Sequence, residues 1–259
     1  IVSYYIKMSS LRKEYDTIGS IDVANDKYWG AQTQRSLQNF AIGHEKMPKE
    51  VIASLVLIKR CAALTNKAIG KLSSDIAETI VEATNKILPK GILDGIRMTD
   101  QFPLSVWQTG SGTQSNMNVN EVLANLANTS LGEQLGSKKP VHPNDHVNMS
   151  QSSNDTFPTA MHIASYVTVK EKLLKSCVKL HKSLLKKQRE FAKICKIGRT
   201  HMQDATPITL GQEFSGYASQ IQYSIERISS SITDLLFLAQ GGTAVGTGIN
   251  SKKNFDKKI

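Results

Sequence analysis

Apolar residues recur at steps of three or four along much of the chain, which is the spacing of an amphipathic helix. The pattern predicts helices over residues 48–70 and 74–87, and a third from about residue 118 to residue 131. A glycine or a proline lies at or just after the end of each, as is usual where helices stop. Before these helices, the apolar residues within 18–23 predict short strand segments.

Two longer helical patterns occupy the second half of the chain. One extends from Thr159 to about Lys193, and the other from Leu210 to about Ala239. In the second pattern the apolar positions advance by three or four residues, as along the seam of a helical bundle. Two such helices cannot bury their seams on each other alone, so we expect further helices from the same chain or from other subunits.

The change from a mixed pattern to long helices near residues 145–158 predicts a domain boundary. We therefore expect a mainly α protein. A mixed, mostly helical N-terminal domain occupies residues 1–148, and residues 149–259 contribute the first long helices of a central helical bundle.

The composition is that of a soluble globular protein, with 40% hydrophobic and 21% charged residues among 259. No apolar run approaches the roughly 20 residues that span a bilayer. The formal charge of +10 comes mostly from lysines spread along the predicted helices, without the interleaved aromatic residues of a nucleic-acid-binding stripe. We therefore expect no nucleic-acid or membrane partner, and the positive charge suits an anionic substrate.

Three cysteines, at positions that predict helix, show no paired spacing. The odd number favours reduced thiols in a cytosolic-type compartment over disulfides or a metal site. Residues 1–8 have neither the basic start and apolar stretch of a signal peptide nor the Arg-rich pattern of a transit peptide. We expect a cytoplasmic protein that starts at Met8, with the mitochondrial matrix as the alternative location in a eukaryote.

Residues 107–121 combine two glycines with a run of hydroxyl and amide side chains before a predicted helix. Exposed backbone N–H groups and the helix dipole favour an anion at such a place, and Ser111, Thr113 and Asn116 add neutral donors. The segment is not a P-loop, because no Gly-Lys-Ser/Thr follows it. The alternative is a polar turn that only caps the helix.

His142 and His146 are four residues apart, which raises the question of a metal site. Pro143 argues against a helix that would align them, and no third ligand stands at a suitable spacing, so we expect no metal. Further on, Asp155 is predicted to cap a helix that contains Pro158 near its start. Three polar residues then precede that helix and can direct donors at an anion: Ser152, Ser153 and Asn154.

The segment of residues 198–213 joins the two long helical patterns. His201 lies there in a predicted polar loop, where a side chain that titrates near neutral pH suits acid–base chemistry. The glycine-rich residues 241–248 either end a helix or let the backbone approach a ligand closely.

Together these segments resemble the class II fumarases of the fumarase/aspartase superfamily. The resemblance extends through residues 28–36, 110–121, 142–155, 198–213 and 241–250. Aspartate ammonia-lyases typically carry other residues at Gln114 and Ser115, at Ser153, and at His201, and at these places the chain is similar to fumarases.

The resemblance implies reversible hydration of fumarate to L-malate in the tricarboxylic acid cycle by a homotetramer, without a metal or an organic cofactor. It implies that His201 is the active-site histidine. It implies that the substrate carboxylates are bound by Ser111, Gly112, Thr113, Ser152, Ser153, Asn154 and Thr200. It also implies a second dicarboxylate site at His142, Pro143, Asn144 and Asp145.

Members of this family carry a later loop, Gly-Ser-Ser-x-Met-Pro-x-Lys-x-Asn, whose serine is assigned as the catalytic base. The 259 residues do not include this loop. We therefore expect an N-terminal portion of the enzyme that is inactive by itself. The alternatives are a lyase of the aspartate ammonia-lyase type, or a non-catalytic fragment that retains dicarboxylate binding.

Overall fold

The computed structural model describes residues 10–259, so the expectations for residues 1–8 lie outside the described residues. The chain forms two compact units. Unit 1 contains the described residues up to Ala164 together with Leu238–Ile259, and unit 2 contains Ser165–Phe237. The units meet at residues 164 and 165, not at the domain boundary expected near residue 148. That domain boundary stays a prediction.

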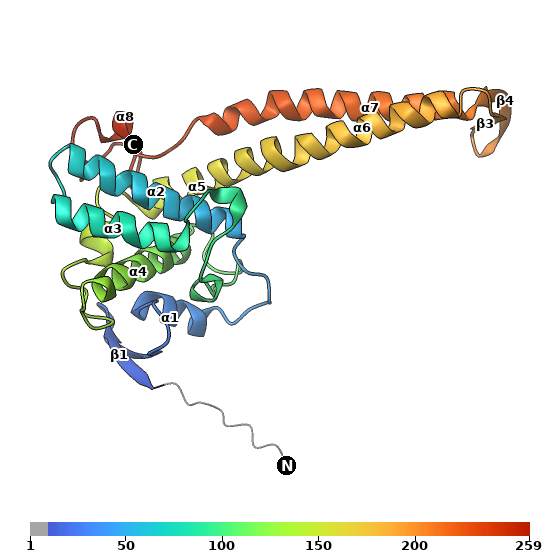
Figure 1. Cartoon of the computed structure of the whole chain (residues 1–259). Coiled ribbons are helices and arrows are strands. Elements are labelled where there is room, and N and C mark those ends of the chain that lie inside the picture. The colour runs from blue at the N-terminus through green and yellow to red at the C-terminus, as the bar shows by residue number, and fades with distance from the viewer. Residues whose placement is uncertain (1–9) are drawn as a thin grey trace, which may run out of the picture. The chain divides into compact units, whose positions relative to one another are not determined.

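Unit 1 is mostly helical, and its elements are coloured from blue to yellow-green, with red at the end of the chain (Figure 1). They are β1 (Leu11–Tyr15), β2 (Ser20–Ala24), α1 (Ala31–Asn39), α2 (Lys49–Ala68), α3 (Ser74–Ile87), η1 (Ile92–Asp94), η2 (Thr99–Gln101), α4 (Thr113–Ser130), η3 (Pro143–Val147), α5 (Ser153–Thr168), which continues into unit 2, and α8 (Phe255–Lys258).

The core of unit 1 lies between α2, α3 and α4, whose inward faces are closed to solvent. The fully buried side chains include Leu55, Val56, Ile80, Ile87, Val119, Val122 and Leu123. The predicted helices over 48–70 and 74–87 are confirmed by α2 and α3. Burial of this apolar area at about 25 cal/mol per Å² is the main stabilising contribution to the unit.

The third helix, α4, begins at Thr113, several residues before the predicted start. The early prediction failed because residues 113–118 are almost all polar and show no apolar period. Gly112 adopts a left-handed conformation, with φ 72°, and starts the helix directly. Thr113 and Asn116, which were expected in a loop, therefore lie in the first turn of α4.

A two-stranded antiparallel sheet forms the start of the described chain. Strand β2 includes Ile21 and Val23, as predicted, whereas Ile18 lies in the turn between the strands. Strand β1 pairs Leu11 with Ala24 and Tyr15 with Ser20. Its mostly charged sequence gives no strand signal, so its existence was not predicted.

Unit 2 is a helical hairpin that ends in a small sheet. Its elements are η4 (Val169–Leu173), α6 (Leu174–Glu190), β3 (Cys195–Thr200), β4 (Gln203–Thr209), α7 (Leu210–Ser231) and η5 (Ile232–Leu236). The long helical patterns are confirmed by α5, α6 and α7, with a π-helical turn at η4. The segment expected as a polar loop is an antiparallel hairpin, and Cys195 lies in its first strand rather than in a helix.

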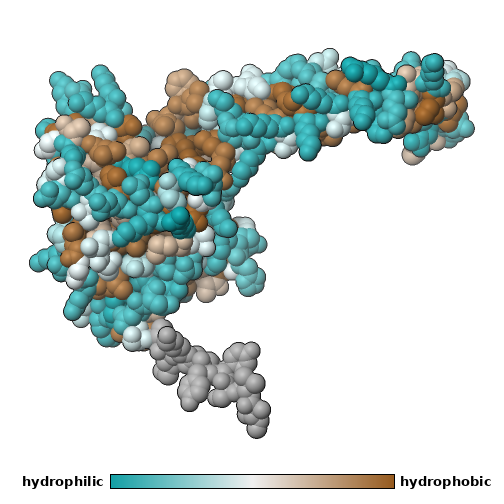
Figure 2. Space-filling view, in the orientation of Figure 1, coloured by the Kyte–Doolittle hydropathy of each residue, from teal (hydrophilic) through white to brown (hydrophobic). Residues whose placement is uncertain are grey.

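Unit 2 buries very little of its own surface. Within Ser165–Phe237, Gly211 and Ala218 are the buried residues. Apolar side chains lie at the surface of this hairpin, where Figure 2 shows brown areas between the hydrophilic ones. They include Leu173, Val178, Leu180, Tyr217 and Tyr223.

Among residues 10–259, none of the helices combines the length and the apolar composition needed to cross a membrane.

Candidate functional site

The N-termini of α4 and α5 meet in unit 1. The Oγ1 atom of Thr113, the first residue of α4, lies 3.0 Å from the Oγ atom of Ser153, the first residue of α5. The hydroxyl of Ser111 lies 3.2 Å from that of Thr113. These hydroxyl groups are exposed to solvent. Residues from two separate segments of the sequence thus form one polar cluster, which we call the hydroxyl cluster.

The N-terminus of α4 is open to an anion. The first backbone N–H groups of a helix have no intrahelical acceptor, and no side chain caps those of α4. A Cβ atom on Gly112 would lie 2.1 Å from the ring of Phe157, which packs from α5 against the glycine. The absence of a side chain at Gly112 therefore allows the two helix N-termini to approach each other.

The N-terminus of α5 is held from inside the unit by Asp155. The prediction that Asp155 caps the helix, with Ser153 and Asn154 before it, is wrong, because α5 begins at Ser153 and Asp155 is its third residue. The Oδ1 of Asp155 accepts the backbone N–H of Ser152 at 2.9 Å. Its Oδ2 accepts the backbone N–H groups of Gly241 at 3.0 Å and Thr243 at 2.9 Å. One buried carboxylate thus fixes both the start of α5 and the glycine-rich segment.

Asn154, in the first turn of α5, also contacts the glycine-rich segment. Its side-chain Nδ2 donates to the carbonyl oxygen of Ala244 at 2.8 Å. The backbone N–H of Asn154 reaches the Oγ of Ser152 at 3.3 Å. Ser152 and Asn154 therefore shape the same turn that places Ser153 beside α4.

The segment after residue 141 forms a short π-helix, η3, although Pro143 was expected to prevent a helix here. Pro143 is its first residue, where a missing N–H removes no hydrogen bond. The Nδ1 of His142 accepts the backbone N–H groups of Asn144 at 3.2 Å and Asp145 at 3.1 Å. The backbone N–H of His142 in turn donates to Nδ1 of His146 at 2.9 Å. The two histidines therefore hold the turn together by hydrogen bonds to its backbone.

The imidazole of His142 is held in its neutral form. Burial is the main cause that lowers the pKa of His142, and the nearby Asp145 opposes this shift. Because Nδ1 accepts two N–H groups, it carries no proton, and Asp145 Oδ2 at 3.2 Å from it is not an ion-pair partner. The proton lies on Nε2, which leaves that nitrogen as a donor.

A hollow of about 590 Å³ connects parts of the two predicted residue sets. Thr113 from the first set and His142, Pro143 and Asn144 from the second all line it. Asp145 is not among the lining residues. The hollow also involves residues that the sequence did not single out: Asp16, Gln32 and Lys138.

Glu121 forms part of this hollow and fixes the start of α1. Its carboxylate accepts backbone N–H groups of Gly30 at 2.9 Å, Gln32 at 2.8 Å and Thr33 at 3.1 Å, and the hydroxyl of Thr33 at 2.7 Å. Burial raises the pKa of Glu121, and these hydrogen bonds oppose that shift. An internal carboxylate therefore occupies the N-terminus of α1, unlike that of α4.

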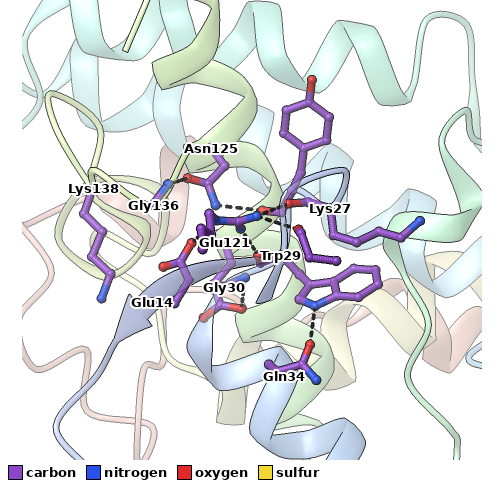
Figure 3. Close-up of polar contacts among 12 residues, drawn as sticks. Glu14, Lys27, Trp29, Gly30, Gln34, Glu121, Asn125, Gly136 and Lys138 are labelled. Carbon is purple, nitrogen blue, oxygen red and sulfur yellow. Dashed lines mark hydrogen bonds and ion pairs between the residues drawn. The ribbon is translucent and has the colours of Figure 1, made fainter. Parts of the chain in front are cut away.

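The surroundings of Glu121 link the sheet, α4 and the loop that carries Lys138 (Figure 3). Asn125, one turn further along α4, donates to the carbonyl oxygen of Tyr28 at 2.8 Å and accepts the backbone N–H of Gly136 at 3.0 Å. Arg12 contacts Glu14 at 2.9 Å in a largely buried ion pair. These contacts hold in place the segments that carry Gln32, Glu121 and Lys138, which line the hollow.

Thr200 and His201 belong to unit 2. Thr200 is the last residue of β3 and pairs with Gln203 of β4. His201 and Met202 form the turn between the strands, and both have left-handed φ values, of 47° and 58°. This is the geometry of a tight two-residue hairpin turn, and it exposes both side chains. His201 thus lies at the tip of a hairpin rather than in an irregular loop.

No group of three His, Cys, Asp or Glu side chains within residues 10–259 is arranged to hold a metal ion. Cys61, Cys177 and Cys195 are free thiols. Burial raises the pKa of Cys61, which makes it a poor nucleophile.

A protein-family model described as a lyase matches residues 19–259. A class II fumarate hydratase of Caulobacter vibrioides is 59% identical over 252 residues, which are 97% of this chain and 53% of that protein. A mitochondrial fumarate hydratase of Schizosaccharomyces pombe is 57% identical over 98% of this chain and 48% of its own length. The chain therefore spans about half the length of these curated relatives.

Among solved structures, a class II fumarase from Schistosoma mansoni is similar to this chain with a TM-score of 0.89 and 46% sequence identity. The similarity covers 96% of this chain and 51% of that one. A fumarate lyase:delta crystallin from Brucella melitensis has the same TM-score at 37% identity. The expected mainly helical fold is thereby confirmed.

Proposed function

This chain belongs to the lyase family, and we propose that it supplies the carboxylate-binding part of a class II fumarate hydratase. The reaction is the reversible hydration of fumarate to L-malate, a step of the tricarboxylic acid cycle. The names of the relatives support the choice of this activity within the family.

The observation that carries the proposal is the meeting of α4 and α5 at Thr113 and Ser153, whose hydroxyl groups lie 3.0 Å apart. Two helix N-termini at one place favour negative charge. The adjoining side chains are neutral donors, so the cluster attracts a carboxylate without binding it as a permanent ion pair. A dicarboxylate that contacts Ser111, Thr113 and Ser153 satisfies these donors.

Such donors also suit the chemistry of the reaction. Removal of the C3 proton of malate places negative charge next to a carboxylate, whose oxygens take it up. Donors directed at those oxygens bind this state more strongly than the substrate and lower the barrier. Gly112, Ser152 and Asn154 shape the cluster. In the assembled tetramer, Thr200 and His201 are proposed to supply a further donor and the acid–base group.

The complete enzyme is proposed to be a homotetramer in which unit 2 packs into a shared helical bundle. Support comes from the small buried area of this unit, in which Gly211 and Ala218 are the buried residues, and from its exposed apolar side chains. Helices with such apolar faces gain stability by packing on further helices. The division into domains at residues 148 and 149 belongs to the same proposal.

The second set of residues is proposed to bind another dicarboxylate, at the hollow that Thr113 also lines. His142 and Lys138 both line the hollow, and Lys138 supplies a positive charge. Pro143 and Asn144 shape this end, and Asp145 holds the backbone of η3 through its N–H bond to His142.

The test is a chimera in which this chain replaces the 252 matching residues of the Caulobacter vibrioides enzyme. We expect the purified chimera to interconvert fumarate and malate and to leave aspartate unchanged. The isolated 259-residue chain is expected to show no turnover. A chimera that sediments like the Caulobacter vibrioides enzyme but lacks activity would overturn the proposal, and turnover of aspartate alone would assign the aspartate ammonia-lyase activity instead.

A further inference from the structure

Lys59 lies in the middle of α2 with its side chain inside the core of unit 1. Its exposed fraction is 0%, which is rare for lysine. Among the described residues, no carboxylate lies within ion-pair distance of its Nζ. The amine donates instead to two amide oxygens, Oδ1 of Asn148 at 2.9 Å and Oε1 of Gln151 at 3.0 Å.

These two amides lie on either side of the turn that leads into α5. Asn148 directly follows η3, and its Oδ1 also accepts the Nδ2 of Asn116 from α4 at 3.1 Å. Gln151 donates its Nε2 to the carbonyl oxygens of Val147 and Met149, both at 3.1 Å. The amine of Lys59 therefore joins α2 to the turn at Asn148, and the same oxygen joins the turn to α4. Asn66 of α2 holds the middle of the turn separately, through Met149 and Ser150.

The other side of the turn is fixed by Asp155. Its two carboxylate oxygens are occupied by backbone N–H groups of Ser152, Gly241 and Thr243. The charge of Asp155 acts on Lys59 at longer range. Between the two anchors lie the residues that the proposed function assigns to carboxylate binding: Ser152, Ser153 and Asn154.

We propose that Lys59 is a positioning residue, which holds Asn148 and Gln151 so that the turn into α5 presents Ser153 to the substrate carboxylate. The inference rests on the proposed function, because it concerns the same carboxylate site. Lys59 itself does not touch the substrate, since its side chain is fully buried.

The chemistry of an amine suits this role. Burial lowers the pKa of Lys59 to about 7, so a large fraction of the amine is neutral near neutral pH. A neutral amine has two N–H groups, and both are used by the two amide oxygens. A methionine fills nearly the same volume but donates nothing, so it leaves both amide oxygens without this partner. The turn is then held on this side by Asn66 and Asn116 alone, and we expect Asn148 and Gln151 to shift.

The experiment compares Lys59→Met with Lys67→Met in the chimera described above. Lys67 is also in α2 but is partly exposed and paired with Glu78 at 2.6 Å, so it serves as the matched control. We expect Lys59→Met to lower kcat/KM for malate by about ten- to a hundredfold, since small displacements of binding groups cost that much. Hydrogen exchange should accelerate in residues 148–155 and remain unchanged in α3.

A second variant tests the same contact from the turn. Gln151→Met removes one acceptor of the amine, together with the Nε2 bonds to Val147 and Met149. The position is not fully buried, so this variant leaves the core intact if Lys59→Met does not fold. It should also lower kcat/KM for malate, but by less than Lys59→Met does. The double variant Lys59→Met with Gln151→Met should lose less than the two single losses combined, because they act through one contact.

The outcomes separate this inference from the proposed function. An unsubstituted chimera without activity overturns the proposed function, and this inference with it. An active chimera whose kcat/KM and exchange in residues 148–155 are unaffected by Lys59→Met or Gln151→Met overturns this inference alone. Loss of melting temperature with unchanged kcat/KM also overturns it, because that result assigns Lys59 to stability only.

Discussion

The hydroxyl oxygens of Thr113 and Ser153 lie 3.0 Å apart, although 40 positions separate these residues in the sequence. Their approach depends on Gly112, against which Phe157 of α5 packs. Each residue is the first of its helix, so the contact also brings together the N-termini of the two helices. If the two hydroxyl groups bind the substrate together, removal of either one should lower kcat.

Thr113→Val keeps the shape of the side chain and removes its hydroxyl. We expect kcat of the chimera to fall by about a hundredfold or more, as when one donor to a developing negative charge is lost. Thr113→Ser should retain most of the activity. Thr79→Val on α3, whose hydroxyl bonds to Asp75 within its own helix, is the control and should leave kcat unchanged. Equal activity of Thr113→Val and Thr79→Val would exclude Thr113 from the site.

The helices with a regular apolar period were predictable from the sequence. Residues 74–87 coincide with α3 because the apolar positions are regular and Pro89 follows the helix. The start of α4 was not predictable, because residues 113–118 show no apolar period and the packing of Phe157 on Gly112 is a tertiary contact. Periodicity describes one helix face and contains no information on such a tertiary contact.

The candidate residues were identified by their types and by resemblance, but their grouping required the structure. Lys59 was overlooked because it is a single polar position within an apolar helical pattern, and its partners lie 89 and 92 residues away. The contact of Glu121 with Thr33 has a similar separation, of 88 residues. Long-range pairs of this kind leave no periodic signal in a single sequence.

Gly112→Ala is expected to destabilise the chain by more than 1 kcal/mol, because the new methyl group meets the Phe157 ring and because φ of 72° disfavours alanine. The same displacement should separate Thr113 from Ser153 and reduce kcat of the chimera. Gly110→Ala is the matched control, since a Cβ atom there meets nothing within 4 Å. Urea unfolding of both variants decides the matter, and equal midpoints would contradict the packing argument.

Glu121→Gln replaces a carboxylate that accepts three backbone N–H groups and the hydroxyl of Thr33. The amide directs its own N–H groups at these donors and leaves part of them unpaired. We expect a loss of about 3 kcal/mol in the free energy of unfolding. The control is Glu78→Gln, an exposed partner of Lys67, which should leave the free energy of unfolding nearly unchanged. A Glu121→Gln chain as stable as the control would refute this assignment.

His201→Asn tests the proposed acid–base role without disturbing the hairpin. Asparagine tolerates the left-handed φ of 47° at this turn position, so the melting temperature should remain unchanged. The kcat of the chimera should fall by about 10² to 10⁴, which is the usual contribution of a general acid or base. His44→Asn, in an exposed segment of unit 1, should have no effect. Full activity of His201→Asn would remove this residue from the mechanism.

The buried amine of Lys59 predicts a pH dependence of stability. Its pKa falls from the ordinary 10.5 to about 7 in the folded chain because burial disfavours the charged form. Between these values the unfolded chain binds a proton at Lys59 that the folded chain does not bind. The contribution of Lys59 to stability is therefore lost as the pH falls from 10.5 towards 7, and lower pH causes no further loss.

The measurement is urea unfolding of the 259-residue chain and of its Lys59→Met variant at several pH values. Relative to the variant, the free energy of unfolding of the parent chain should rise between about pH 7 and about pH 10, by at most about 5 kcal/mol. Lys67→Met should keep the slope of the parent, because Lys67 is partly exposed. Identical slopes for the parent and Lys59→Met would mean that the amine stays charged in the fold. The long-range attraction of Asp155 would then outweigh the cost of burial, since Asp155 is the charge that opposes the shift.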